Sequence, residues 1–192
     1  LWTIVFSGSC KSDKPAPTPN PGIPFAKGAD IGWLTEMEAA GKKFYNAAGT
    51  ETECIALLKS LGMNSIRLRV WVNPAGGWNN AADVLAKATR AKNAGMRLMI
   101  DFHYSDTWAD PGQQAIPVAW AAQTLTELQT SVYNHTFSVL ESLKSNGIVP
   151  EWVQVGNETN NGMLWPIGKA STSMSNFAAL VKQGYNAVKA VD

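Results

Sequence analysis

The fold of this chain is decided by the segment WVQVGNET at residues 152–159. Its apolar, mainly β-branched residues predict a short buried strand, which Gly156 ends. Asn157 and Glu158 then fall at the carboxyl-terminal tip of that strand. An acid beside an amide at this place is typical of a parallel α/β barrel, which keeps its catalytic groups there. The alternative is a solvated loop glutamate, because loops carry most charged residues.

Strands and helices alternate along the rest of the chain. Strands are expected at 25–32, 64–71, 96–103 and 151–156, and helices at 51–61, 81–94, 119–146 and 173–191. Repeated β-α units predict a parallel sheet with helices on its outside, and about forty residues a unit suit a (β/α)8 barrel with generous loops. We therefore expect the first four βα units of a truncated TIM barrel. An open doubly wound sheet is the alternative, but its nucleotide-binding form has a glycine-rich first turn, which is absent after Ile31.

The composition argues against several functional classes. The chain has 192 residues, 45% of them hydrophobic, which is enough for one core of ordinary size. Its 16 basic and 15 acidic residues form no basic block, so nucleic acid and anionic membrane surfaces are not expected as partners. No CxxC, HExxH or GxGxxG motif occurs, which leaves redox, zinc-protease and dinucleotide-binding functions unsupported. Cys54, within a predicted helix, is expected to be a small buried hydrophobe.

The N-terminal residues predict export. Residues 1–10 join an apolar run, three small residues and Cys10, which is typical of the end of a bacterial lipoprotein signal whose cysteine becomes acylated. The charged start of such a signal is missing, so we expect the natural chain to begin earlier. Residues 11–24 carry regularly spaced prolines and predict a tether to a catalytic domain at 25–192. The lipoprotein reading implies a cell-surface or periplasmic protein whose lipid is its one membrane contact, and an ordinary secretory signal is the alternative.

Charged side chains gather on two neighbouring strands. Arg67 and Arg69 are two residues apart and so share a face of the second strand. A buried guanidinium needs an anionic partner, for which a catalytic carboxylate and a structural ion pair are the alternatives. Asp101 and His103 share a face at the tip of the third strand, which makes His103 a candidate site residue. The second histidine, His135, is expected to be structural, because it lies in the middle of a helix.

A metal site is the competing interpretation of the third strand tip. Its four candidate ligands are Asp101, His103, Asp106 and Asp110. Their spacing fixes no ligand geometry, so a metal site is the weaker interpretation.

Three segments resemble glycoside hydrolase family 53, the endo-β-1,4-galactanases. They are RLRVWVNP at 67–74, DFHYSDTWADP at 101–111 and GNE at 156–158, and residues 28–31 are similar to the family's first strand. The second segment is specific to the family, whereas GNE marks the wider clan of retaining barrel glycosidases. The resemblance covers residues 25–192.

The resemblance implies an eight-stranded barrel that hydrolyses the β-1,4-galactan of pectic arabinogalactan, with no cofactor. It implies a retaining mechanism with two glutamates, in which Glu158 is the general acid/base and Asn157 binds the 2-hydroxyl of the sugar. Arg69 would orient the nucleophile. Further residues of the substrate cleft would be His103, Trp108 as a stacking platform, Asp101, Asp30 and Arg67. Glu158 must be protonated in the first step, which burial and the charge of the second carboxylate would favour.

The chain departs from the family in one respect. The nucleophile should follow a seventh strand, and no glutamate of residues 1–192 fills that place, so we expect this fragment alone to be inactive. We also expect its unpaired sheet edges to favour association. Metal binding in the family maps to the missing half, so none is inferred here. Rival interpretations are an endoglucanase or mannanase, a surface-anchored galactan-binding protein without catalysis, and an interaction module.

Overall fold

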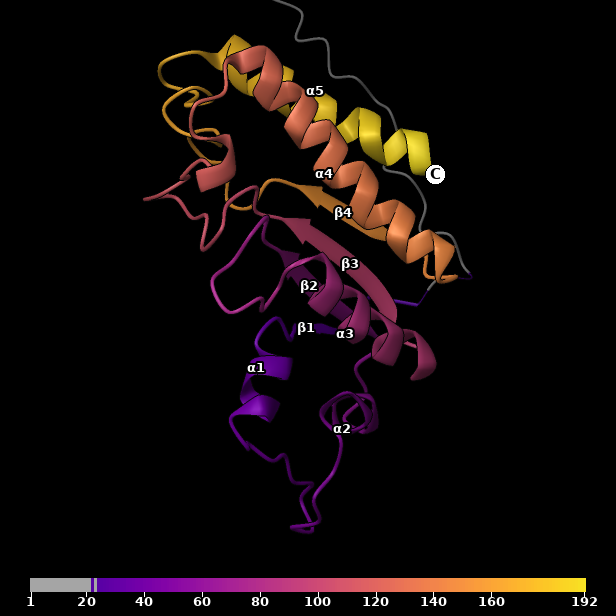
Figure 1. Ribbon diagram of the computed structural model, residues 1–192. Helices are drawn as coiled ribbons and strands as arrows, with labels where there is room; N and C mark the ends of the chain where they lie inside the picture. Colours follow the sequence, from indigo (N-terminus) through magenta and orange to yellow (C-terminus); the bar gives the residue numbers. More distant parts are fainter. Residues whose placement is uncertain (1–21, 23) are drawn as a thin grey trace, which may run out of the picture.

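The computed structural model describes residues 22 and 24–192. The predicted signal, Cys10 and most of the proline-rich tether lie outside these residues. The described part is built on a parallel four-stranded sheet in the order β1-β2-β3-β4 (Figure 1). The strands are β1 (Gly28–Asp30), β2 (Ser65–Val70), β3 (Arg97–Phe102) and β4 (Trp152–Val155). Each connection between neighbouring strands carries at least one helix, which is the pattern of repeated βα units.

Helices cover one side of the sheet. They are α1 (Leu34–Ala39), α2 (Cys54–Ser60), α3 (Ala81–Asn93), the 3₁₀ helix η1 (Val118–Trp120), α4 (Leu125–Ser145) and α5 (Met174–Val191). Helix α3 packs on β2 and β3, α5 packs on β4, and α4 lies along α5 (Figure 1). Gly184 allows α5 to approach the sheet, since a Cβ at this position would lie 2.4 Å from Val155 Cγ1.

Most expected elements are present, with corrections at their ends. The predicted helix 119–146 is wrong in its first part, because Thr124 caps a new helix there. Its hydroxyl accepts from the Glu127 backbone N–H while the Glu127 carboxylate accepts from the Thr124 N–H, a capping box that starts α4. The first strand is only three residues long, and α1 was not expected. Cys54 is buried at the start of α2, as expected.

Side chains alternate between the two faces of β2 and β3. The outward residues are buried under the helices and comprise Ile66, Leu68, Val70, Leu98, Ile100 and Phe102. The register pairs Arg69 with Asp101, and Asp101 with Gln154, so polar residues of three strands meet on the other face. The alternation follows from the two-residue period of a strand.

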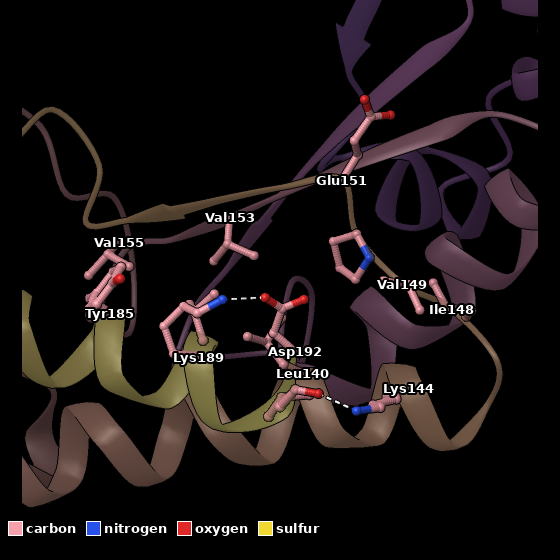
Figure 2. A pocket seen from close by; sticks show the side chains of 13 residues that line it. Leu140, Lys144, Ile148, Val149, Glu151, Val153, Val155, Tyr185, Lys189 and Asp192 are labelled. Atoms are coloured by element: carbon pink, nitrogen blue, oxygen red, sulfur yellow. Dashed lines mark hydrogen bonds and ion pairs between the residues drawn. The ribbon is translucent and has the colours of Figure 1, made fainter. Parts of the chain in front are cut away.

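The strand β4 is half-buried, although the sequence predicted a buried one. Within the described residues it pairs only with β3, which leaves its other edge open. A groove of about 480 Å³ runs between β4 and helices α4 and α5. Figure 2 shows Val153 and Val155 of β4 facing Tyr185 and Lys189 of α5 across this groove. No helix of the described part is long and apolar enough to cross a membrane.

Candidate active site

A chain of ion pairs joins the inward side chains of β1, β2 and β3. The Nη1 of Arg67 lies 2.6 Å from Asp30 Oδ2, and its Nη2 lies 2.6 Å from Asp101 Oδ2. The Asp101 side chain is fully buried, whereas those of Arg67 and Asp30 are each about one-third exposed. Two carboxylates therefore hold one guanidinium, which fits the structural ion pair rather than a pairing with Glu158.

The same arginine fixes Asn157 at the tip of β4. Arg67 Nη2 donates to Asn157 Oδ1 at 2.9 Å, and Gln154 Nε2 donates to the same oxygen at 3.2 Å. Asn157 Nδ2 donates to the Ala109 carbonyl at 2.8 Å. An amide nitrogen carries two hydrogens, so one N–H of Asn157 has no partner among the described residues. The amide is thus held rigidly while it keeps one donor for a ligand.

The tautomer of His103 follows from its neighbours. Its Nδ1 accepts from Trp71 Nε1–H and from the Ala109 N–H, each at 3.2 Å. The proton of the neutral ring therefore belongs to Nε2. Nε2 lies 2.9 Å from Asp101 Oδ2, at an angle that makes no hydrogen bond. Both side chains are completely buried, so His103 is fixed in place by its neighbours.

Three tryptophans surround Arg69. Its Cζ lies 4.4 Å from the ring centroid of Trp108 and 5.3 Å from those of Trp33 and Trp71. Only 4% of Arg69 is exposed, and burial lowers the pKa of its guanidinium, an effect that the charge of Asp30 opposes. Contact with aromatic faces stabilises a cation that has lost most of its water.

Arg69 also has hydrogen-bond donors that no described residue accepts from. Its nearest carboxylate oxygen is Asp30 Oδ1, 3.4 Å from Nη1, while Nε and Nη2 have no hydrogen-bond partner among the described residues. The guanidinium lies directly over Gly32, where a Cβ would come within 2.6 Å of Cζ. Glycine at this position leaves room for the Arg69 guanidinium in the place where it is observed. Buried donors without partners are rare in folded proteins, which makes Arg69 a candidate binding residue for an anion.

Comparison with known proteins assigns the chain to a family. The sequence profile of the family described as Glycosyl hydrolase family 53 matches residues 26–192. The chain belongs to glycosyl hydrolase family 53.

Relatives of the family match in sequence and in fold. A probable arabinogalactan endo-β-1,4-galactanase A of Aspergillus terreus is 43% identical over 163 residues, which cover 85% of this chain and 46% of that protein. The family 53 catalytic domain of Ignisphaera aggregans superposes with a TM-score of 0.83 at 39% identity, over 91% of this chain and 51% of that one. A structure from a study of two fungal β-1,4-galactanases gives 0.82 at 38% identity, over 85% and 49%.

These family 53 matches confirm the predicted fold, a set of four βα units from a (β/α)8 barrel. The chain spans about half the length of the curated relatives it matches. The open sheet edges of β1 and β4 in the described residues are those at which a barrel continues.

Glu158 lies apart from the ion-pair network of this family 53 site. It is exposed and has a backbone φ of +45°, and its carboxylate has no hydrogen-bond partner among the described residues. The burial expected for it is therefore absent here. Its main chain is held by Gln114 Nε2, which donates to the carbonyls of Asn157 at 2.8 Å and of Glu158 at 3.4 Å. The Asn-Glu pair is thus fixed through its backbone, with the acid pointing into open space.

The alternative metal site receives no support from the geometry. Asp106 accepts from the backbone N–H groups of Asn73 and Val118, and Asp110 accepts from that of Gly112. These oxygens accept from backbone N–H groups of loops, and the described part of the chain contains no group of three or more His, Cys, Asp and Glu residues that could hold a metal ion.

Sequence reasoning missed four residues of the site. Trp33 and Trp71 complete the aromatic surround of Arg69, while Gln114 and Gln154 hold the Asn157-Glu158 turn. Trp33 and Trp71 each follow closely after a strand, a signal that could have identified them. Gln114 lies in a loop, and its role depends on the tertiary fold.

Proposed function

We propose that this chain is part of an endo-acting, retaining glycoside hydrolase that cleaves β-1,4-galactan. Membership of family 53 supports hydrolysis of glycosidic bonds, and the names of the Aspergillus terreus relative and of the fungal galactanases support galactan as substrate. The observation that carries the proposal is the Asn157-Glu158 pair at the tip of β4, where the amide is fixed by Arg67 and the acid remains accessible.

Glu158 is the proposed general acid/base. In a retaining enzyme this residue protonates the leaving oxygen and later activates water, while a second carboxylate about 5–5.5 Å away attacks the anomeric carbon. Asn157, with one free N–H, would donate to the 2-hydroxyl of the reacting sugar. That hydrogen bond strengthens as charge develops on the ring in the transition state.

Arg69 is the proposed partner of the nucleophilic carboxylate. Its Nε and Nη2 are buried donors, and a carboxylate can accept from a guanidinium through two parallel hydrogen bonds. Such a pairing would hold the nucleophile ionised and correctly oriented. His103, Asp101, Arg67 and Asp30 would form the wall of the cleft, and their network would keep Asn157 and Arg69 in position.

The proposal is tested by the Glu158→Gln variant of the full-length protein on β-1,4-galactan. We expect kcat to fall by about 10²–10⁴-fold, because the amide can neither donate nor accept the proton. Glu141→Gln, an exposed substitution on α4, is the matched control and should leave kcat unchanged. NMR of the first products should show retained anomeric configuration.

Three results would overturn parts of the proposal. An unchanged kcat in Glu158→Gln would remove the acid/base assignment. Cleavage of cellulose or mannan in preference to galactan would favour another retaining barrel glycosidase. Binding of galactan without cleavage by the full-length wild-type protein would favour the non-catalytic binding protein.

We also propose that the protein is exported and acylated at Cys10. The support is the sequence of residues 1–10, with small residues directly before the cysteine. Metabolic labelling with a fatty acid should mark the wild-type protein and not Cys10→Ser; equal labelling of both would contradict the anchor.

A further inference from the structure

A single lysine of helix α3 joins the two loops that flank Arg69. The Lys87 side chain is completely buried, and its ammonium group donates to three oxygens. They are the Gly32 carbonyl at 2.7 Å, Asn79 Oδ1 at 2.9 Å and Asp83 Oδ2 at 2.7 Å. An ammonium group has three hydrogens, so Lys87 has no donor left for a ligand. It binds only groups of its own chain, and its role is to be found in what it holds.

The first group that Lys87 holds is the backbone beneath Arg69, in the loop after β1. The Gly32 N–H donates to Asp30 Oδ1 at 2.9 Å, and the Gly32 carbonyl accepts from Lys87. The Cα atom of Gly32 lies between these two hydrogen bonds, directly under the guanidinium of Arg69. A shift of this backbone would move the surface on which the guanidinium rests. Lys87 therefore fixes one side of the space that Arg69 occupies.

The second group is Asn79, in the loop after β2. Asn79 is completely buried and has a backbone φ of +64°, a left-handed conformation that few residues other than glycine adopt. Its backbone N–H donates to Asp83 Oδ2 at 2.6 Å, while its side chain accepts from Lys87. Its carbonyl accepts from the Trp71 N–H at 2.9 Å, and the ring centroid of Trp71 lies 5.3 Å from Arg69 Cζ. Lys87 therefore also fixes a second side of the space around Arg69.

Stability alone is a poor explanation for an ion pair at this depth. Burial lowers the pKa of Lys87, and the hydrogen bond and charge of Asp83 oppose that effect. Removing two charges from water costs free energy, and apolar residues of similar volume often stabilise a core as well or better. Apolar residues could not bind the Gly32 carbonyl or the Asn79 side chain, however. The geometry that the ammonium group imposes on the two loops therefore explains the pair better than its contribution to stability.

We propose that Lys87 is a positioning residue of the candidate active site, which holds Gly32 and Asn79 so that the guanidinium of Arg69 keeps its place and orientation. Without the ammonium group, both loops lose their common anchor and Arg69 loses two of its boundaries. That Arg69 pairs with the nucleophilic carboxylate rests on the proposed function, whereas the positioning of Arg69 by Lys87 does not.

The first test follows Arg69 itself in the full-length protein, by NMR of the arginine Nε–H groups, where its signal is the one missing from Arg69→Lys. In Lys87→Met, which keeps an apolar stem without the ammonium group, we expect this signal to shift and to exchange faster with water. Asp83→Asn/Lys87→Met leaves no unpaired buried charge and should show the same changes, so it serves if the single variant does not fold. Val139→Ala, a buried substitution on α4, is the matched control for lost stability and should leave the signal unchanged.

The second test measures kcat and KM of the same variants against pH. If Arg69 holds the nucleophile ionised, its displacement raises the pKa of that carboxylate, because a nearby cation favours the charged form. The acidic limb of the kcat/KM profile should therefore move to higher pH by about 0.5–1 pH unit. We expect kcat to fall about tenfold with KM little changed, because a misplaced group slows the reaction more than it weakens binding. Gly32→Ala should give the same result, since its Cβ would come within 2.6 Å of Arg69 Cζ.

The two tests separate this inference from the proposed function. If the Arg69 signal and the acidic limb both move in Lys87→Met, both proposals stand. If the signal moves while the limb stays in place, Lys87 positions Arg69, but Arg69 is not the partner of the nucleophile. If Lys87→Met lowers Tm as Val139→Ala does and leaves the Arg69 signal unchanged, Lys87 is only structural and the inference is overturned. A wild-type protein that cleaves no β-glycan would refute the proposed function, and the NMR measurement would still decide the role of Lys87.

Discussion

The two faces of β2 and β3 differ in their side chains: the outer face is apolar and packs in the core, and the inner face is charged and lines the candidate site. The outer face is entirely aliphatic or aromatic and is sealed by helices, with Ile66, Leu68 and Ile100 at zero exposure. The inner face carries Arg67, which short ion pairs join to Asp30 and Asp101, and Arg69, whose buried guanidinium keeps two donors without a hydrogen-bond partner among the described residues. Successive side chains of a strand point to opposite sides, so alternate residues of one strand can stabilise the core while the residues between them form a polar site.

The largest expected effect is loss of stability from the outer face. Ile100→Ala should lower the free energy of unfolding by about 2–5 kcal/mol, since it removes buried methyl groups and leaves a cavity. Denaturant titration measures the loss, and Ile100→Val should cost about 0.5–1.5 kcal/mol. If Ile100→Ala unfolded at the wild-type midpoint, the outer face would not be the main source of stability.

The second effect is a pH dependence from the helical layer that covers the outer face. His135 of α4 packs among the rings of Phe102, Tyr104 and Trp120, and burial lowers its pKa to about 4. The unfolded state, with an ordinary histidine pKa, binds the proton first as the pH falls below 6.5. Stability is therefore complete above about pH 6.5 and declines by up to about 3 kcal/mol as the pH approaches 4.

Denaturant titrations at pH 7, 5.5 and 4.5 measure this decline. In His135→Phe the loss of stability that His135 causes between pH 7 and 4.5 should disappear, because phenylalanine does not titrate. A variant with the same slope as the wild type would show that other groups cause the decline.

The smallest of the three effects on stability should come from a substitution on the inner face, which should also lower the activity. Asp101→Asn keeps the size of the side chain but removes the charge that faces Arg67, so unfolding should become easier by about 1.5–3 kcal/mol. Because Arg67 also holds Asn157, kcat/KM of the full-length protein should fall more than tenfold, a change of over ~1.4 kcal/mol in the transition-state barrier. Steady-state kinetics beside Glu141→Gln check this, and unchanged kinetics would show that the network is only structural.

Much of the fold could be read from the sequence. The three longer strands were expected within one residue of their observed ends, because Gly62 and Gly95 stand just before two of the runs and Gly156 directly after the third. The helix expected at 119–146 was too long at its start, since its apolar pattern gave no sign of the break that the capping box at Thr124 makes. The strand β4 was expected to be buried, but burial depends on neighbours outside the segment itself.

The sequence by itself determined the parallel βα architecture and the residue types at the strand tips, because hydrophobic period and turn residues are local properties. It also identified Arg67, Asp101, His103 and Asn157 as site candidates. Only the tertiary structure decided their contacts: that Arg67 bridges Asp30 to Asp101, that tryptophans surround Arg69, and that Glu158 is exposed. Those contacts join residues from different strands and loops. The register of the sheet and the packing of the loops bring these residues together, and spacing along the chain does not determine either.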